Sequence, residues 1–174
     1  KSGSGFKVMT RQGTTLETKT ILVCSGSHHR KLGVPGEKEL DGKGVVYCST
    51  CDAPLFGGKV VAVVGAGNAA LEAVRDLLSY AVKVHMLVRS EKIKGDPLTF
   101  DQIKGDPRVE IMYLTEVQEI LGQQFVTGIK YIHTPSNQVN ELKLDGVFIE
   151  IGSIPNVEFL GDVVQKTPYN EIIV

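Results

Sequence analysis

Residues 48–67 read CSTCDAPLFGGKVVAVVGAG, and this stretch decides the fold that we expect. The β-branched run Lys59–Val64 predicts a buried strand, which breaks at Gly65-Ala66-Gly67. Beyond the break, apolar residues recur on one helical face, at Ala70, Leu71, Val74, Leu77 and Leu78. A strand, a glycine turn and a helix in this order form the context that a dinucleotide-binding fingerprint requires.

The fingerprint itself is the GxGxxA pattern of residues 65–70. Gly65 permits the tight turn, and Gly67 lets the backbone approach a pyrophosphate at the positive end of the following helix. We therefore expect a nucleotide to bind at Gly65, Gly67, Asn68 and Ala69. The alternative is that the glycines only connect the strand to the helix.

The choice of nicotinamide cofactor should be decided where the second strand, Lys83–Val88, ends. An acidic residue there would hold the ribose diol, whereas Arg89 offers a guanidinium suited to a 2′-phosphate. We predict NADPH, held by Arg89, Ser90 and Lys94, with NADH as the alternative because Glu91 follows closely. A second alternative is that these polar side chains only solvate the strand end.

Cys48 and Cys51 form a CxxC pair with Asp52 directly behind it. Three interpretations compete, namely a zinc half-site, a structural pair and a redox pair. A zinc site would need further ligands, but Cys24, His85 and His133 are scattered over separate elements, so we expect no metal. We favour the redox interpretation, because the pair enters a short helix whose N-terminal dipole would stabilise a thiolate.

The remaining pattern extends the βαβ unit into a larger sheet. A short helix begins at Asp96-Pro97 and continues to about Lys104, and residues 109–114 predict a third strand. An antiparallel meander, which could cover one face of a parallel sheet, is expected at residues 116–121, 125–133 and 138–144. Residues 146–151 predict another buried strand. The expected fold class is α/β, a Rossmann-like three-layer ββα domain of the FAD/NAD(P)-binding type with an antiparallel β-meander.

The chain before the CxxC pair predicts three simpler features. Residues 6–10 and 15–18 suggest a small hairpin around Gln12-Gly13, and Ile21–Cys24 suggests a buried strand. Residues 28–44, rich in glycine and in alternating charges, are expected to form a surface connection.

Composition limits the partners and the compartment. With 174 residues, a net charge of -1 and no apolar run near the ~20 residues of a membrane span, we expect neither nucleic acid nor membrane as a partner. Three cysteines do not make a disulfide framework, and a cytoplasmic redox pair fits better. The chain starts at Lys1 in a Ser/Gly stretch and stops in the apolar run 171–174, so we expect the middle of a longer protein.

Five segments together resemble the low-molecular-weight thioredoxin reductases and the related alkyl hydroperoxide reductase flavoproteins. They are ILVCSG at 21–26, VPGE at 34–37, GVVYCSTCDAPLF at 44–56, GAGNAA at 65–70 and IGSIPN at 151–156. The resemblance implies an NADPH domain at residues 34–151, inserted in an FAD domain of which residues 1–33 and 152–174 are remnants. It also implies that Ile151 and Gly152 contact cofactor. Two FAD-holding motifs of the family are missing, so we expect this piece to bind flavin poorly.

The resemblance implies a disulfide reductase in which electrons pass from NADPH through FAD to the Cys48–Cys51 disulfide. Cys51 would face the flavin, Cys48 would attack a thioredoxin-like or peroxiredoxin-like protein, and Asp52 would protonate the departing thiolate. The full-length protein would be a homodimer whose NADPH domain rotates about hinges near residues 34–44 and 152–156. The alternatives are a flavin-free NAD(P)-binding redox module and an NADH-dependent peroxiredoxin reductase.

Overall fold

The computed structural model describes residues 5–173, which divide into two compact units. One unit is His29–Gly152, and the other joins the segment before it to the segment from Ser153 onward. The Ser/Gly start at residues 1–4 and the last residue of the apolar run 171–174 lie outside the described residues.

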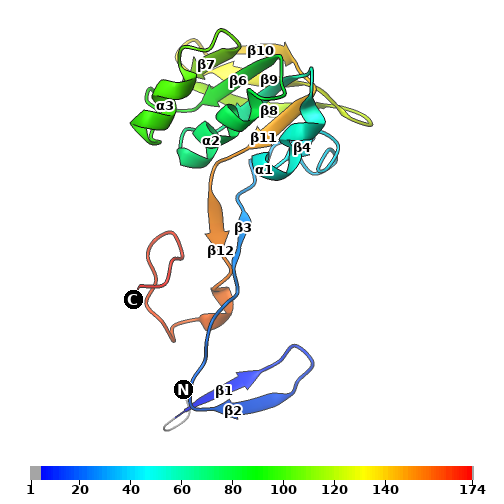
Figure 1. Ribbon diagram of the computed structural model, residues 1–174. Coiled ribbons are helices and arrows are strands. Elements are labelled where there is room, and N and C mark those ends of the chain that lie inside the picture. The colour runs from blue at the N-terminus through cyan, green and yellow to red at the C-terminus, as the bar shows by residue number, and fades with distance from the viewer. Residues whose placement is uncertain (1–4, 174) are drawn as a thin grey trace. The chain divides into compact units, whose positions relative to one another are not determined.

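A five-stranded parallel sheet forms the centre of the unit His29–Gly152 (Figure 1). Its strands lie in the order β4-β11-β5-β6-β7 and all pair in parallel. They are β4 (Val45–Val46), β11 (Gly146–Ile149), β5 (Val60–Val64), β6 (Lys83–Val88) and β7 (Val109–Tyr113). Nearly continuous runs of valine, isoleucine and leucine suit strands that are covered on both faces. The predicted βαβ unit and the strand after it are thereby confirmed.

Helices cover one face of this sheet. They are α1 (Ser49–Asp52), the 3-10 helix η1 (Ala53–Phe56), α2 (Asn68–Leu77) and α3 (Pro97–Ile103). The predicted apolar face of α2 is buried against β5 and β6, and Phe56 meets Phe148 edge to face. Asp96 caps α3 as predicted, because its carboxylate accepts the backbone N–H of Thr99 at 2.8 Å. Among residues 5–173, no helix is long and apolar enough to cross a membrane.

A second sheet covers the opposite face. It contains β8 (Thr115–Gly122), β9 (Val126–His133) and β10 (Gln138–Lys143), which pair antiparallel in the order β10-β9-β8. Ile120 and Ile129 of this meander pack into one core with alternate residues of the parallel sheet. The expected three-layer ββα arrangement is therefore confirmed.

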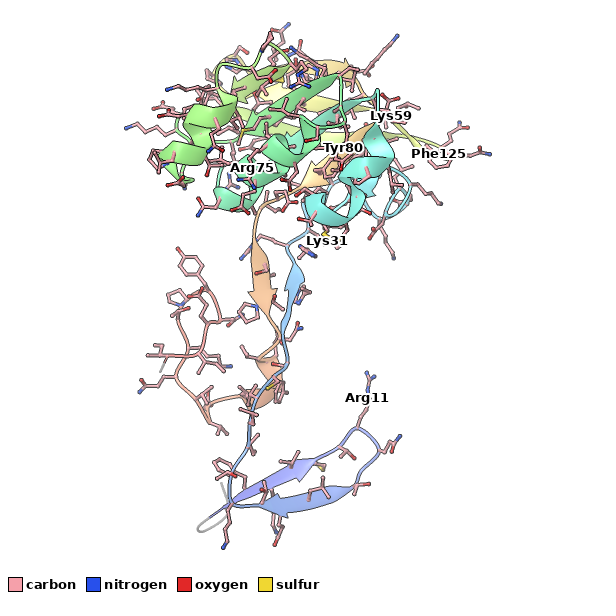
Figure 2. The ribbon with its side chains drawn as sticks, in the orientation of Figure 1. Arg11, Lys31, Lys59, Arg75, Tyr80 and Phe125 are labelled. Carbon is pink, nitrogen blue, oxygen red and sulfur yellow. A yellow bond between two sulfur atoms is a disulfide. The ribbon has the colours of Figure 1, made fainter. Side chains whose placement is uncertain are left out.

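The other unit contains a hairpin and, apart from His29, a second two-stranded sheet. The predicted hairpin forms from β1 (Phe6–Met9) and β2 (Thr15–Thr18), with Arg11 at its turn (Figure 2). β3 (Ser27–His29) pairs with β12 (Ser153–Pro155), and a short 3-10 helix, η2 (Glu158–Leu160), follows.

The buried strand expected at Ile21–Cys24 is not present. This segment has no regular structure, Leu22 is 88% exposed, and Cys24 is an exposed free cysteine rather than a buried one. A buried strand needs neighbours that pair with its backbone, and none of the described strands pairs with residues 21–24. The apolar run alone was insufficient to predict burial.

The connection at residues 28–44 is not wholly a surface segment. Leu40 is 1% exposed and belongs to the core beneath the meander, and Glu37 is 4% exposed. The segment folds back because the carbonyl of Pro35 accepts the backbone N–H of Ile120 in β8, at 2.9 Å. The charged composition of this segment predicts its exposed residues, but it does not predict that Leu40 and Glu37 are buried.

Candidate functional site

The predicted nucleotide turn lies between β5 and α2. Gly65 has a φ of 150°, a conformation that favours glycine, and a Cβ there would clash with the carbonyl oxygen of Glu150. Gly67 caps α2 without any side-chain hydrogen bond, and a Cβ added to it would meet nothing within 4 Å. The helix start is therefore open on the side that a Gly67 Cβ would occupy, while Gly95 packs against the Gly67–Asn68 peptide. This arrangement fits a pyrophosphate at the positive end of the helix.

The segment after β6 is fastened to this turn. The backbone N–H groups of Lys94 and Gly95 both donate to the carbonyl of Ala66, at 2.8 and 3.0 Å. The side-chain oxygen of Asn68 accepts the N–H of Asp96 at 2.7 Å. The structure thus brings the predicted residues Lys94 and Asn68 together, and it uses the Asn68 side-chain oxygen to hold the segment.

The other two predicted residues of this segment have different surroundings. Arg89 directly follows β6 and is exposed, and Ser90 donates its hydroxyl to the carbonyl of Lys92 at 2.8 Å. The Gly65 N–H donates to the carbonyl of Leu87 at 3.1 Å, so the end of β6 and the glycine turn lie at the same edge of the sheet. Cofactor contacts of Arg89 and Ser90 remain predictions.

Ile151 and Gly152 follow β11 at this same edge. The backbone N–H of Glu150, immediately before them, donates to the carbonyl of Val64 at 2.9 Å. Ile151 packs against the core beneath the meander, and the carbonyl of Gly152 accepts the backbone N–H of Arg30 at 2.9 Å. Their predicted contact with cofactor also remains a prediction.

The CxxC pair forms a disulfide at the start of α1. Cys48 is the N-cap residue, the Cα atoms of Cys48 and Cys51 lie 5.4 Å apart, and Cys51 is exposed. Asp52 ends the helix and donates its backbone N–H to the carbonyl of Cys48 at 3.1 Å. The predicted short helix is confirmed, and the exposure of residue Cys51 suits thiol–disulfide exchange.

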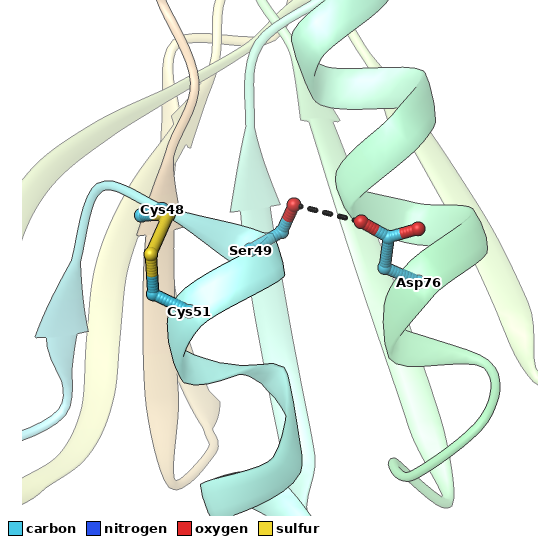
Figure 3. The surroundings of a disulfide bond; sticks show 4 residues. All are labelled: Cys48, Ser49, Cys51 and Asp76. Atoms are coloured by element: carbon cyan, nitrogen blue, oxygen red, sulfur yellow. Dashed lines mark hydrogen bonds between the residues drawn. A yellow bond between two sulfur atoms is a disulfide. The ribbon is translucent and has the colours of Figure 1, made fainter.

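Ser49, inside the pair, is a residue that the sequence reasoning missed. It is buried, and its hydroxyl donates to the carboxylate of Asp76 on α2 at 3.1 Å (Figure 3). Asp76 also lies 3.6 Å from the guanidinium of Arg75. No local pattern signals this contact, because the two partners are 27 residues apart.

Tyr47, directly before the pair, was also missed. Its hydroxyl donates to Glu37 at 2.9 Å, the Lys31 ammonium lies 3.6 Å from the ring centroid, and His29 stacks on the ring. Burial raises the pKa of Tyr47 to about 12; Glu37 adds to this shift, while the charge of Lys31 opposes it. The neutral hydroxyl therefore remains a donor at neutral pH.

Glu37 accepts three hydrogen bonds although it is nearly inaccessible to solvent. Besides Tyr47, it accepts the backbone N–H of Leu32 at 3.0 Å and that of Gly33 at 2.6 Å. Buried carboxylates are stable only when paired in this way. Glu37 lies in the VPGE segment, and nothing in that segment indicates that Tyr47 is its partner.

Glu150 is a further ionisable group beside the pair. It is half-buried and follows β11. Burial is the largest cause that raises the pKa of Glu150, to about 7; Glu72 and Asp76 add to the shift, and the Ser49 N–H opposes it.

The residues weighed for a zinc site lie apart. His85 is in β6, His133 ends β9, and Cys24 belongs to the other unit. Within the described part of the chain, no group of three His, Cys, Asp or Glu side chains is placed to hold a metal ion.

Comparison with known proteins gives relatives along the whole chain. An alkyl hydroperoxide reductase subunit from Staphylococcus aureus (strain NCTC 8325 / PS 47) is 36% identical over 174 residues, which are 100% of this chain and 34% of that protein. A protein named NADH dehydrogenase from Bacillus subtilis (strain 168) is 37% identical over 169 residues, 97% of this chain and 33% of that protein. The chain thus spans about a third of the length of these relatives.

Solved structures are also similar to this chain along its whole length. The thioredoxin reductase of Lactococcus lactis matches with a TM-score of 0.89 and 27% identity, and that of T. acidophilum with 0.87 and 34%. Each match covers 100% of this chain and 57% of the solved one. The expected resemblance is confirmed. Since the family model described as pyridine nucleotide-disulphide oxidoreductase matches residues 4–174, the chain belongs to that family.

Proposed function

We propose that this chain is the nucleotide-binding and disulfide-bearing part of an NADPH-dependent disulfide reductase that also uses FAD. The observation that carries the proposal is that one helix serves both sites. The first turn of α2 borders the open glycine turn, and Asp76 near its other end holds Ser49 between the two cysteines. The family and the thioredoxin reductase structures imply FAD and NAD(P)H as cofactors.

The proposed domain organisation follows the two units. Residues 34–151 would form the NAD(P)H domain, which nearly coincides with the unit His29–Gly152. Residues 1–33 and 152–174 would belong to the FAD domain. The hinges would lie near residues 34–44 and 152–156.

On the nucleotide side, the backbone N–H groups of Asn68 and Ala69 would bind the pyrophosphate at the open start of α2. Arg89, Ser90 and Lys94 would surround the ribose 2′-phosphate, and the two hydrogen bonds from the Lys94 segment to Ala66 support this placement. When bound, the two cofactors supply the two electrons that cleave the Cys48–Cys51 bond.

On the disulfide side, the Cys48 thiolate would attack a disulfide of the partner and form a mixed disulfide. Asp52 would give a proton to the departing partner thiolate. The Cys51 thiolate would then attack Cys48, which restores the Cys48–Cys51 bond and releases the partner with both of its sulfurs reduced. The position of Cys48 at the start of α1, where helix N–H groups favour a thiolate, supports its role as the attacking cysteine.

The partner would be a thioredoxin-like or a peroxiredoxin-like protein, which are the classes that the names of the similar proteins suggest. The 36% identity to the staphylococcal alkyl hydroperoxide reductase protein favours a second candidate, an NADH-dependent reductase of a peroxiredoxin. The two candidates differ in the nucleotide, so affinity for NADPH against NADH separates them.

The test uses the full-length protein with Cys48→Ser and Cys51→Ser. We expect each substitution to abolish NADPH-dependent reduction of a protein disulfide, with nucleotide affinity in calorimetry unchanged, because the thiols lie outside the glycine turn. Cys24→Ser is the matched control and should retain activity, since Cys24 is an exposed cysteine outside the pair. Wild-type turnover by either variant, or failure of the wild-type protein to bind NADPH or NADH, would refute the proposal.

A further inference from the structure

Leu114 has a backbone conformation that leucine rarely adopts. Its φ is 52°, in the left-handed region, where the Cβ of an ordinary residue crowds the following carbonyl oxygen. Among residues 5–173, the other non-glycine residues with a positive φ are Asn137 and Asn170, and asparagine tolerates this region in turns. A leucine in this conformation is an outlier that its surroundings must hold in place.

Leu114 is the single residue between β7 and β8. The chain passes here from the parallel sheet into the meander, and the left-handed conformation supplies the change of direction. Tyr113, the last residue of β7, lies opposite Val88, the last residue of β6. Leu114 therefore lies level with the start of the Arg89–Ser90 segment, at the edge of the sheet that carries the glycine turn.

Three hydrogen bonds hold the backbone of Leu114. Its N–H donates to the carbonyl of Ser90 at 3.4 Å, and its carbonyl accepts the N–H and the hydroxyl of Thr134 at 2.8 and 3.2 Å. The next residue, Thr115, is 3% exposed and donates its hydroxyl to the carbonyl of Tyr113 at 2.8 Å. Because Thr134 follows β9, these bonds run from the meander through Leu114 to Ser90.

The segment that receives the Leu114 hydrogen bond is also held along its length. The Ser90 hydroxyl closes a turn on the carbonyl of Lys92 at 2.8 Å. Farther along, the N–H of Lys94 donates to the carbonyl of Ala66 in the glycine turn at 2.8 Å. Leu114 thus supports the end of the segment next to β6, and Ala66 supports the end next to the glycine turn.

We propose that Leu114 is a positioning residue for nucleotide binding, because its left-handed backbone holds the Arg89–Ser90 segment where the ribose 2′-phosphate would lie. This inference rests on the proposed function and deepens it. Rotation of residue 114 into an extended conformation would change the angle between its N–H and its carbonyl, so the bonds to Ser90 and Thr134 could not both remain. The bond to Ser90 is the longest of the three, and it would break first.

The experiment compares Leu114→Val with Leu114→Gly in the full-length protein, by calorimetric titration with NADPH and with NADH. Valine is β-branched and disfavours the left-handed region, whereas glycine adopts it freely. We expect Leu114→Val to weaken NADPH about fivefold and NADH less than about twofold, because the displaced segment carries the groups for the 2′-phosphate. Leu114→Gly should keep both affinities within about twofold of wild type.

Asn137→Val is the matched control. Asn137 is exposed and has a φ of 53° in the turn between β9 and β10 of the same unit. The substitution places the same β-branched side chain in the same conformation, so it should lower the urea midpoint of unfolding to a similar extent as Leu114→Val. Both nucleotide affinities should nevertheless remain unchanged, which separates positioning from a general loss of stability.

Thr134→Val keeps the inference testable if Leu114→Val fails to fold. It removes the hydroxyl that donates to the Leu114 carbonyl and should weaken NADPH about two- to threefold, with NADH unchanged. Wild-type NADPH affinity in the Leu114→Val or the Thr134→Val protein, equal losses for the two nucleotides, or the same loss in Leu114→Gly or Asn137→Val would overturn the inference alone. A wild-type protein that binds neither nucleotide would overturn the inference and the proposed function together.

Discussion

Two turns of the same unit, the glycine turn at 65–67 and the disulfide turn at 48–51, are built in opposite ways. The glycine turn leaves the start of α2 without a side-chain cap and with open space over Gly67. The disulfide turn is held by side-chain hydrogen bonds, from Ser49 to Asp76 and, directly before the pair, from Tyr47 to Glu37.

The difference agrees with the function that we propose for each turn. A turn that binds an anion needs backbone N–H groups that no protein acceptor satisfies. A turn that exchanges disulfides needs sulfur atoms in a fixed geometry, because exchange depends on thiolate fraction and on access. Substitutions that fill the first turn or loosen the second should therefore have distinct effects.

The largest effect is expected within the glycine turn, where Gly65 and Gly67 should respond differently. Gly65→Ala places a Cβ against the Glu150 carbonyl at a φ of 150° and should lower the free energy of unfolding by about 2–4 kcal/mol. Gly67→Ala meets no atom, so it should cost less than about 1 kcal/mol of stability yet weaken nucleotide binding about tenfold or more.

Urea unfolding and calorimetric titration with NADPH measure the two effects separately. Gly105→Ala is the control, because a Cβ there also meets nothing within 4 Å and the residue lies outside the turn. Equal changes in unfolding free energy and in NADPH affinity for the two variants would contradict the distinction between Gly65, where a Cβ clashes, and Gly67, where it meets no atom.

The next effect tests how firmly the disulfide turn is held. Glu37→Gln removes a buried charged acceptor of three hydrogen bonds and should lower the free energy of unfolding by about 2–3 kcal/mol. Tyr47→Phe removes one donor and should lower it by about 1 kcal/mol. Glu39→Gln and Tyr80→Phe, which alter exposed residues, should stay near wild type in urea unfolding.

Tyr47 also predicts a dependence on pH. Its pKa is raised, so the folded protein keeps the proton of Tyr47 where the unfolded chain has lost it. The stabilisation is complete below about pH 10 and disappears as the pH rises towards about 12. The stability difference between wild type and Tyr47→Phe should shrink over this interval, and a constant difference would contradict the role of Tyr47.

A smaller effect is expected for Arg89, and it tests which nucleotide the glycine-turn site prefers. Arg89→Ala should weaken NADPH about tenfold in calorimetry and NADH much less, because the guanidinium suits only the 2′-phosphate. Arg11→Ala, in the exposed hairpin turn shown in Figure 2, is the matched control. An equal loss of affinity for both nucleotides would place Arg89 on some other group.

The smallest effect concerns the segment that borders the open turn. Asn68→Ala removes the acceptor for the Asp96 N–H and should cost about 1 kcal/mol of stability in urea unfolding. NADPH affinity should fall about two- to threefold, as the segment carrying Lys94 loses one of its three attachments to the turn. Asn140→Ala, whose hydrogen bond is local within β10, should leave NADPH affinity unchanged.

The elements that could be predicted are those with a local signal. The strand at 60–64, the glycine turn and the α2 helix follow from periodicity and from glycine within twenty residues. Asp96 and Pro97 predict the start of α3 in the same way. The order of the meander followed from its turns, so three layers were predictable without a structure.

The rest depends on partners distant in the chain. Ser49 and Asp76 meet only because α1 packs against α2, and Glu37 reaches Tyr47 only because residues 28–44 fold back. Ile21–Cys24 shows the converse, since its apolar side chains predict burial that no described strand provides. The propensity of a segment indicates the secondary structure that it favours, but tertiary contacts decide whether that structure forms.

The hydrogen bond from Ser49 to Asp76 connects the disulfide turn to the helix that begins at the glycine turn. Asp76 lies on α2, the helix whose first turn would bind the nucleotide. Nucleotide binding at one end of α2 and reduction of the disulfide beside its other end would therefore involve the same helix. Thermodynamic linkage makes such sharing reciprocal. If a nucleotide bound the dithiol form more tightly than the disulfide form by some factor, it would shift the thiol–disulfide equilibrium towards the dithiol by that same factor.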